Sequence, residues 1–116
     1  MKILLVVICT TLFLVGCKTT EPKYYYGEYP KTVYSYFNAD DVTVNQQITI
    51  LEGVIEQAEG INKPVPPGVH AHLGMLYFET GNKVQGLSNF EQEKALFPES
   101  ASYLDFLISN IAGVKI

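Results

Sequence analysis

Few residues of this chain have side chains that could do chemistry. The nucleophilic thiols are Cys9 and Cys17, and the imidazoles that could bind a metal are His70 and His72. On a helix the two histidines would point about 200° apart, so they could not bind one ion, and we expect His70 to be packed or to cap a helix. None of the five serines lies in a Gly-x-Ser-x-Gly turn, and no glycine-rich phosphate loop is present. We therefore expect no catalytic residues, no metal and no enzyme activity.

Cys17 stands at the end of an apolar run. This run, residues 3–15, follows Lys2 and falls short of the about 20 apolar residues that cross a bilayer, so it is typical of a secretory signal peptide. The sequence LVGC at residues 14–17 resembles the lipobox of bacterial lipoproteins. In that motif a small residue before the cysteine admits signal peptidase II, and the thiol of the cysteine receives diacylglycerol. The resemblance implies cleavage between Gly16 and Cys17; the alternatives are a buried cysteine behind an ordinary signal peptide, or an uncleaved anchor.

The lipobox divides the chain into three parts. These are a lipoprotein signal peptide over residues 1–16, a flexible lipidated tether over 17–23 and a folded domain over 24–116. Diacylglycerol and an N-acyl chain on Cys17 would anchor the protein stably in a membrane. Bacterial lipoproteins with aspartate after the cysteine stay in the inner membrane, so Lys18 favours the outer membrane, with the domain facing the periplasm. Residues 18–29 could span at most about 40 Å.

Composition limits the class of protein. A chain of 116 residues and 12.9 kDa holds one small domain at most. It is 47% hydrophobic and 17% charged, which is too apolar for a disordered chain. The net charge is −4 and arginine is absent, so we expect no nucleic-acid partner. One cysteine would remain after signal cleavage, so disulfide bonds would play no part.

The first half of the domain predicts two helices. Apolar residues recur at helical spacing over residues 42–59, in a stripe made of Val44, Ile48, Leu51, Ile55 and Ala58. We expect Asp40 or Asp41 to cap this helix and Gly60 to end it. A shorter helix over residues 31–38 should precede it, because Pro30 suits a helix start.

Proline and glycine divide the second half of the domain. Residues 63–67 contain three prolines and predict an extended linker. Helices are expected over residues 67–81, with Pro67 in the first turn, and over 82–96. A fifth helix, capped by Ser100, would carry one apolar face made of Leu104, Leu107, Ile108 and Ile111. No alternating run is long enough for a sheet, so the predicted class is all-α, with about five helices.

Residues 67–100 resemble one tetratricopeptide repeat. The matching positions are Leu73, Gly74, Tyr77, Gly81, Asn82, Phe90 and Pro98. Three positions depart from the pattern: His70 replaces the usual tryptophan, and Gly86 and Glu93 stand where alanine is preferred. Since one repeat cannot bury both of its faces, the resemblance implies a short tetratricopeptide-like array completed by the flanking helices. The alternative is a generic helical hairpin.

A second resemblance covers most of residues 24–104. It is carried by YGEY at 26–29, Tyr34, Tyr36, VPPG at 65–68, Leu73-Gly74, Gly81-Asn82, Glu93-Lys94 and FPES at 97–100. These residues resemble a family of small Gram-negative outer-membrane lipoproteins known only as a domain of unknown function. The resemblance implies a lipid-anchored protein without catalytic residues. Genes of that family often lie beside those of other small lipoproteins, so another lipoprotein is a candidate partner.

The repeat register predicts a partner groove. In a tetratricopeptide repeat the first helix lines the concave surface, and the residues expected there are Ala71, Met75, Phe78 and Glu79, joined by Ser102, Asp105 and Ser109 of the fifth helix. Exposed Met75 and Phe78 beside acidic residues would suit a peptide or helix with apolar anchors and basic flanks. The alternative is that Met75 and Phe78 are buried against other parts of the array.

Six of the eight tyrosines fall in one short segment. They are Tyr24, Tyr25, Tyr26, Tyr29, Tyr34 and Tyr36. Such a segment could bind glycan, lie at a lipid interface or pack across the helices.

These observations leave three hypotheses for the function. The first is a non-catalytic interaction or scaffolding module in the cell envelope, with an envelope protein as partner. The second is a regulator that activates a periplasmic cell-wall enzyme, and the third is a glycan or lipid binder. None of them involves a cofactor or a small-molecule substrate.

Overall fold

The fold is described from a computed structural model of the chain, over residues 1–3, 16–17, 20–38 and 42–111. Most of the predicted signal peptide, Lys18, the proposed caps Asp40 and Asp41, and residues 112–116 lie outside these ranges. Within the described ranges, no helix has the length and apolar character needed to cross a membrane.

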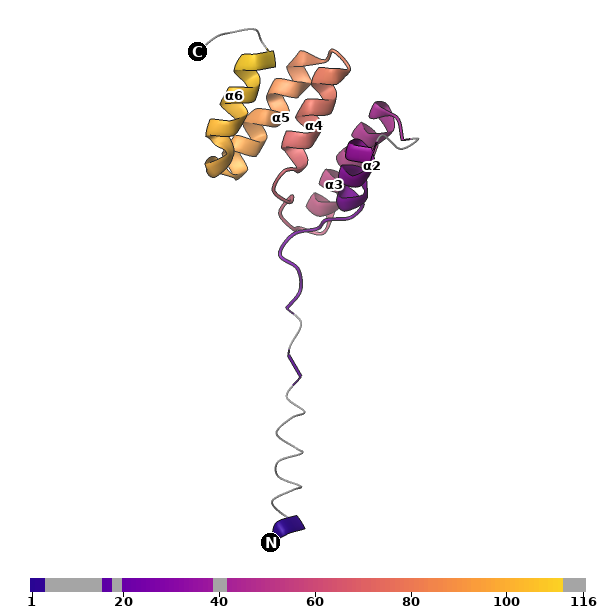
Figure 1. Cartoon of the computed structure of the whole chain (residues 1–116), viewed down its shortest axis with the longest axis vertical. Helices are drawn as coiled ribbons and strands as arrows, with labels where there is room; N and C mark the ends of the chain where they lie inside the picture. Colours follow the sequence, from indigo (N-terminus) through magenta and orange to yellow (C-terminus); the bar gives the residue numbers. More distant parts are fainter. Residues whose placement is uncertain (4–15, 18–19, 39–41, 112–116) are drawn as a thin grey trace.

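Five α-helices follow one another in the described part of the chain, and a short 3-10 helix precedes the last. They are α2 (Tyr29–Asn38), α3 (Val44–Gly60), α4 (Val69–Glu79), α5 (Lys83–Leu96), η1 (Pro98–Ser100) and α6 (Ala101–Ile111). The helices run alternately up and down, and each packs on the helix before and the helix after it (Figure 1). The predicted all-α class and short array of about five helices are confirmed, and no strand occurs in the ranges described.

A capping box begins α3. The Thr43 side chain accepts a hydrogen bond from the Gln46 N–H at 3.2 Å, and the Gln46 Oε1 accepts one from the Thr43 N–H at 2.8 Å. The prediction that Asp40 or Asp41 caps this helix is therefore wrong, because a threonine followed three residues later by glutamine satisfies the same N–H groups. The last helical residue is Gly60, as predicted.

Two clusters of buried apolar side chains join α3 to α4. One consists of Val54, Ala58, Val65 and Val69, and the other of Leu51, Leu73 and Leu76. Tyr29, the first residue of α2, packs against both clusters. The core therefore lies between α3 and α4, with the start of α2 laid over it.

Helix α4 begins later than predicted. Its N-cap is Gly68, with a φ of 92° that favours glycine, and Pro67 lies outside the helix. Glycine has no side chain to satisfy the first N–H groups, so Glu93 of α5 does so. Its Oε1 accepts from the Gly68 N–H at 2.7 Å, and its Oε2 accepts from the Ala71 N–H at 3.3 Å. A carboxylate is favourable at a helix N-terminus, so the departure of Glu93 from the repeat pattern has a structural role.

Helices α4 and α5 approach each other closely at two glycines. A Cβ atom on Gly74 would lie 2.5 Å from the Phe90 ring and 3.0 Å from the carbonyl oxygen of Gly86. A Cβ atom on Gly86 would lie 2.8 Å from the Phe78 ring. The predicted turn between the helices contains Gly81, whose φ is 81°.

Ser100 precedes α6 without capping it. Its hydroxyl donates a hydrogen bond to the carbonyl oxygen of Phe97 at 2.7 Å, so the predicted capping role is wrong. Of the apolar face predicted for this helix, Leu104 is buried, Leu107 and Ile108 are half-buried and Ile111 is exposed. Helix α6 is thus covered on one side only.

Candidate functional site

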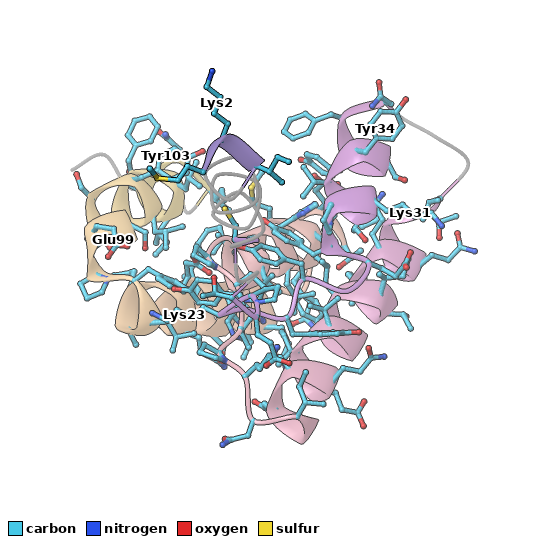
Figure 2. All side chains as sticks on the ribbon, turned by 90° about the horizontal axis from the view of Figure 1, so that it is seen from below. Lys2, Lys23, Lys31, Tyr34, Glu99 and Tyr103 are labelled. Carbon is cyan, nitrogen blue, oxygen red and sulfur yellow. The ribbon has the colours of Figure 1, made fainter. Side chains whose placement is uncertain are left out.

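A groove lies across alternate helices of the array. Its volume is about 400 Å³, and it is lined by Tyr29, Val33, Tyr36 and Phe37 of α2, by Gly68, Ala71, His72 and Met75 of or next to α4, and by Tyr103 of α6. Figure 2 shows α2 and α6 on opposite sides, with Tyr34 and Tyr103 on the same face of the array. None of the described residues that line the groove is charged.

The floor of the groove is helix α4. Ala71 and Met75, both predicted groove residues, are half-buried and line it. His72 also lines it, although it was not among the predicted groove residues. Its side chain is almost fully buried, and its Nε2 has no hydrogen-bond partner among the described residues. Burial lowers the pKa of His72, and the nearby carboxylate of Glu79 opposes that effect.

Helix α2 forms one wall of the groove. The Tyr36 hydroxyl donates to the Glu79 Oε1 at 2.8 Å, and its ring centroid lies 4.9 Å from that of His72 in an edge-to-face arrangement. Burial and the hydrogen bond to Glu79 raise the pKa of Tyr36. Tyr36 therefore stays a neutral donor, and it holds α2 against α4 at the C-terminal end of α4. Glu79, a predicted groove residue, is bonded to a lining residue and does not itself line the groove.

Tyr29 closes the other end of this wall. A Cβ atom on Gly68 would lie 2.6 Å from the Tyr29 hydroxyl, so the absence of a side chain at Gly68 makes room for the tyrosine. Burial, followed by the nearby carboxylate of Glu93, raises the pKa of Tyr29. The start of α4 thus brings together a left-handed glycine, a buried carboxylate and a tyrosine.

Helix α6 contributes different residues from those predicted. Tyr103 lines the groove, whereas Asp105 bonds to Lys94 of α5 at 2.7 Å and so faces α5. Ser109 donates to the carbonyl oxygen of Phe106, and Ser102 is exposed without lining the groove. The register taken from the repeat pattern is wrong for this helix, because its contact with α5 turns the polar face away from the groove.

Phe78 was also predicted to line the groove, and this prediction is wrong. Its ring centroid lies 5.3 Å from that of Phe90, and the ring covers Gly86 of α5. Phe78 therefore packs within the α4–α5 hairpin and does not line the groove. Gly86 stands where the tetratricopeptide pattern prefers alanine, and its lack of a side chain leaves the space that this ring fills.

The six tyrosines of the N-terminal segment lie in different surroundings. Tyr24 contacts Phe97 edge-on at a centroid distance of 6.3 Å, and the Tyr25 hydroxyl donates to the Gln57 Oε1. Tyr29 and Tyr36 line the groove, whereas Tyr26 and Tyr34 are exposed. The segment is therefore mostly packed across the helices.

Sequence reasoning missed part of the groove. Val33 and Phe37 follow Tyr29 at four-residue spacing on α2, and this spacing was a usable signal for one helix face. Tyr103 had no comparable signal, because its place depends on how α6 meets α4.

The remaining chemically capable residues lie apart from the groove. The Cys17 thiol is free and exposed, and Gly16 before it is exposed too. His70 is buried, and its Nδ1 lies 3.0 Å from the Asn89 Oδ1. Because the Asn89 amide nitrogen donates to the Gln85 carbonyl, its Oδ1 must accept, so the His70 Nδ1 carries the proton. In the described residues, no three His, Cys, Asp or Glu side chains gather as a metal site would require.

Comparison with known proteins identifies the family. A family model described as Domain of unknown function (DUF4810) matches residues 23–107. The chain belongs to this family. No curated protein and no solved structure matches it.

The DUF4810 match covers the groove completely. It spans the tyrosine segment, helices α2 to α5 and the first part of α6, so every residue that lines the groove lies inside it. Cys17 lies outside the match. The groove therefore belongs to the DUF4810 domain itself, and the domain's own name assigns it no activity.

Proposed function

We propose that this protein is a non-catalytic interaction module of the cell envelope, anchored by lipid to the outer membrane and facing the periplasm. The observation that carries the proposal is the uncharged groove of about 400 Å³, lined mainly by apolar and aromatic side chains from α2, α4 and α6. Such surfaces recognise peptide segments through a few apolar anchors. The lining includes no nucleophile paired with a base, so binding is the function that it supports best.

The anchor is assigned to Cys17. Its thiol and the glycine before it are both exposed, as acylation and signal cleavage require. Diacylglycerol and an N-acyl chain on this residue would hold the domain at the membrane without a spanning helix. Lys18 supports sorting to the outer membrane.

The α4–α5 hairpin supports a tetratricopeptide-like array. Gly74 and Phe90 meet where two repeat helices approach closely, and Gly81 lies in the turn between them. The groove is formed by α2, α4 and α6, which alternate with α3 and α5 along the chain. This alternation is the arrangement that a short series of such repeats would produce.

The proposed occupant is a peptide or helix with apolar anchor side chains and a basic flank. Met75 and the aromatic rings would hold the anchors, since methionine adapts to different shapes. Glu79, at the end of the groove beside Tyr36, would pair with the basic flank. A partner on another envelope protein, such as a neighbouring lipoprotein, fits this description.

Crosslinking in cells tests the groove. A photo-crosslinking residue replaces Met75 or Tyr103 in the groove, or Val84 outside it, in the otherwise native protein. Val84 is a suitable control because it is exposed on α5 and lines no part of the groove. We expect the same discrete adduct from Met75 and Tyr103, and none from Val84.

A substitution separates binding from folding. Met75→Glu should abolish the adduct formed from Tyr103 because it places a charge on the groove floor, whereas Val84→Glu should leave that adduct unchanged. Circular dichroism checks that both variants remain helical. A folded Met75→Glu variant that keeps the adduct would rule out the groove as the binding surface.

The described contacts favour neither of the other two hypotheses. Glycan binding by the tyrosine segment needs several tyrosine faces gathered on one surface, but Tyr25 is bonded to Gln57 of α3, whereas Tyr29 and Tyr36 face the groove. For the activation of a cell-wall enzyme, the described residues offer no surface that is distinct from the groove and specific to that role.

A further inference from the structure

We propose that one end of the helical array rests on the phospholipid surface to which Cys17 is anchored. This end, called the strap end, is where α3 and α5 finish and where α2, α4 and α6 begin (Figure 1). The proposal rests on the acylation of Cys17 proposed above. It adds an orientation for the domain and a second lipid contact, made by the folded part of the chain.

The chain joins the array soon after Cys17. The Lys63 ammonium donates to the carbonyl oxygen of Pro22 at 3.3 Å and lies 3.9 Å from the Glu21 carboxylate. From Tyr24 onward, aromatic side chains pack on the helices, with Tyr24 against Phe97 and Tyr25 bonded to Gln57 of α3. Pro22 and Lys23, which were predicted to belong to a flexible tether, therefore lie beside the strap end.

The length of the connection limits the orientation. Tyr24 follows Cys17 by seven residues, a stretch that spans at most about 25 Å when fully extended. Residues 18–29 could span about 40 Å when fully extended, but from Tyr24 onward this stretch is packed on the helices. With Tyr24 packed at the strap end, the anchored chain holds that end within about 25 Å of the acyl chains. The opposite end lies about 20 Å farther along the array, the length of α5, so the strap end is the end tethered closest to the membrane.

The strap end carries exposed side chains suited to a lipid interface. Tyr26 is 44% exposed, Ile61 is 54% exposed and Leu96 is 51% exposed, and they precede α2, follow α3 and end α5 respectively. Tyrosine is favoured where one end of the ring is apolar and the other is wet. Lys23 is exposed there as well, with its ammonium 5.2 Å from the centre of the Tyr24 ring.

Charge does not dominate this surface. Lys23 and Lys63 are offset by the exposed carboxylates of Glu21, Glu59 and Glu99. Contact through apolar side chains should therefore occur on zwitterionic lipid as well as on anionic lipid. Apolar exposure alone does not select the strap end, because Val84 at the other end of α5 is 79% exposed. The short connection to Cys17 is what places the strap end, rather than the opposite end, next to the membrane.

Two positions on one helix make a matched test. Leu96 and Val84 lie at opposite ends of α5, about 18 Å apart along its axis. Each is replaced singly by cysteine in the full chain, and Ile61→Cys is a third variant. The lipidated proteins are purified from membranes and incorporated into vesicles of phosphatidylethanolamine, with or without phosphatidylglycerol. Acylation blocks Cys17, so a polarity-sensitive fluorophore labels the introduced thiol.

Nitroxide-labelled phospholipids then report proximity to the bilayer. We expect the probes at Leu96 and Ile61 to shift to shorter wavelength and to be quenched several-fold more strongly than the probe at Val84. Ile61→Glu combined with the Leu96 probe should weaken the quenching and leave flotation with the vesicles unchanged. The quenching should be similar with and without phosphatidylglycerol.

The outcomes separate this proposal from the lipid anchor. Protein that floats with the vesicles but shows equal quenching at Leu96 and Val84 is anchored without the proposed orientation, and it overturns this inference alone. Protein that does not float contradicts both the anchor and the orientation. Shielding of the Leu96 probe only when purified peptidoglycan is added would assign the strap end to the cell wall and would also overturn the proposal.

Discussion

His72 gives the groove a residue that responds to pH. Its side chain is 8% exposed, and its ring lies near those of Tyr36 and Tyr29, at centroid distances of 4.9 and 6.3 Å. Burial lowers the pKa of His72, and Glu79 opposes that effect only in part. The folded protein therefore favours the neutral imidazole, whereas the unfolded chain binds a proton at a higher pH.

This difference predicts a loss of stability in mild acid. The free energy of unfolding should decrease as the pH falls below about 6.5, because the unfolded chain then takes up a proton that the folded protein resists. The decrease continues until the pH reaches the lowered pKa of His72 in the folded protein. Its total size is about 1.4 kcal/mol for each unit by which folding lowers that pKa. Urea unfolding at about pH 7.5 and about pH 5.5 measures it. His72→Gln should lose less stability than the native protein over this interval, and equal losses would contradict the assignment.

At the scale of an element, the α4–α5 hairpin depends on the lack of a side chain at Gly74. An alanine Cβ there would lie 2.5 Å from the Phe90 ring and 3.0 Å from a backbone oxygen of α5. Phe90 is fully buried, so its ring has little room to move. Gly74→Ala should therefore destabilise the protein by about 1–3 kcal/mol, as extra methyl groups in packed cores do. Urea denaturation of the purified domain measures this change.

Gly53 provides the matched control for this prediction. It lies within α3, and a Cβ atom there would meet nothing within 4 Å. Gly53→Ala should stabilise the protein by about 0.5–1 kcal/mol, because alanine favours a helix interior. Stabilisation by alanine at both glycines would show that helix propensity, rather than close packing, governs the hairpin.

The helices were easier to predict than their mutual contacts. Periodicity and the positions of proline and glycine were sufficient for α3, α4 and α5, because these signals act within a single helix. The side-chain directions of Phe78 and Asp105 depended on neighbours, namely the space above Gly86 and the ammonium of Lys94. A pattern within one helix does not contain that information, so of the residues predicted for the groove Ala71 and Met75 line it, whereas those predicted on α6 do not.

At the scale of the whole molecule, the tyrosine segment makes the array a single unit. Tyr29 packs against both buried clusters and also lines the groove. Tyr25 bonds to Gln57 of α3, and Tyr36 bonds to Glu79 of α4. Damage to this segment should therefore lower the stability of the whole array and not only that of α2.

Tyr29→Ala tests this cooperativity. Removing the ring would leave space beside both clusters, and we expect a loss of about 2–4 kcal/mol, less than for a fully buried aromatic residue. Tyr34→Ala, on the same helix but 63% exposed, should change stability by less than about 0.5 kcal/mol. The measurement is urea unfolding followed both by circular dichroism and by tyrosine fluorescence. Coincident transitions, both shifted to lower urea in Tyr29→Ala, would show that α2 and the rest of the array unfold together. If circular dichroism kept its native midpoint while fluorescence shifted, α2 would be an independent attachment, and the groove wall could detach without unfolding the core.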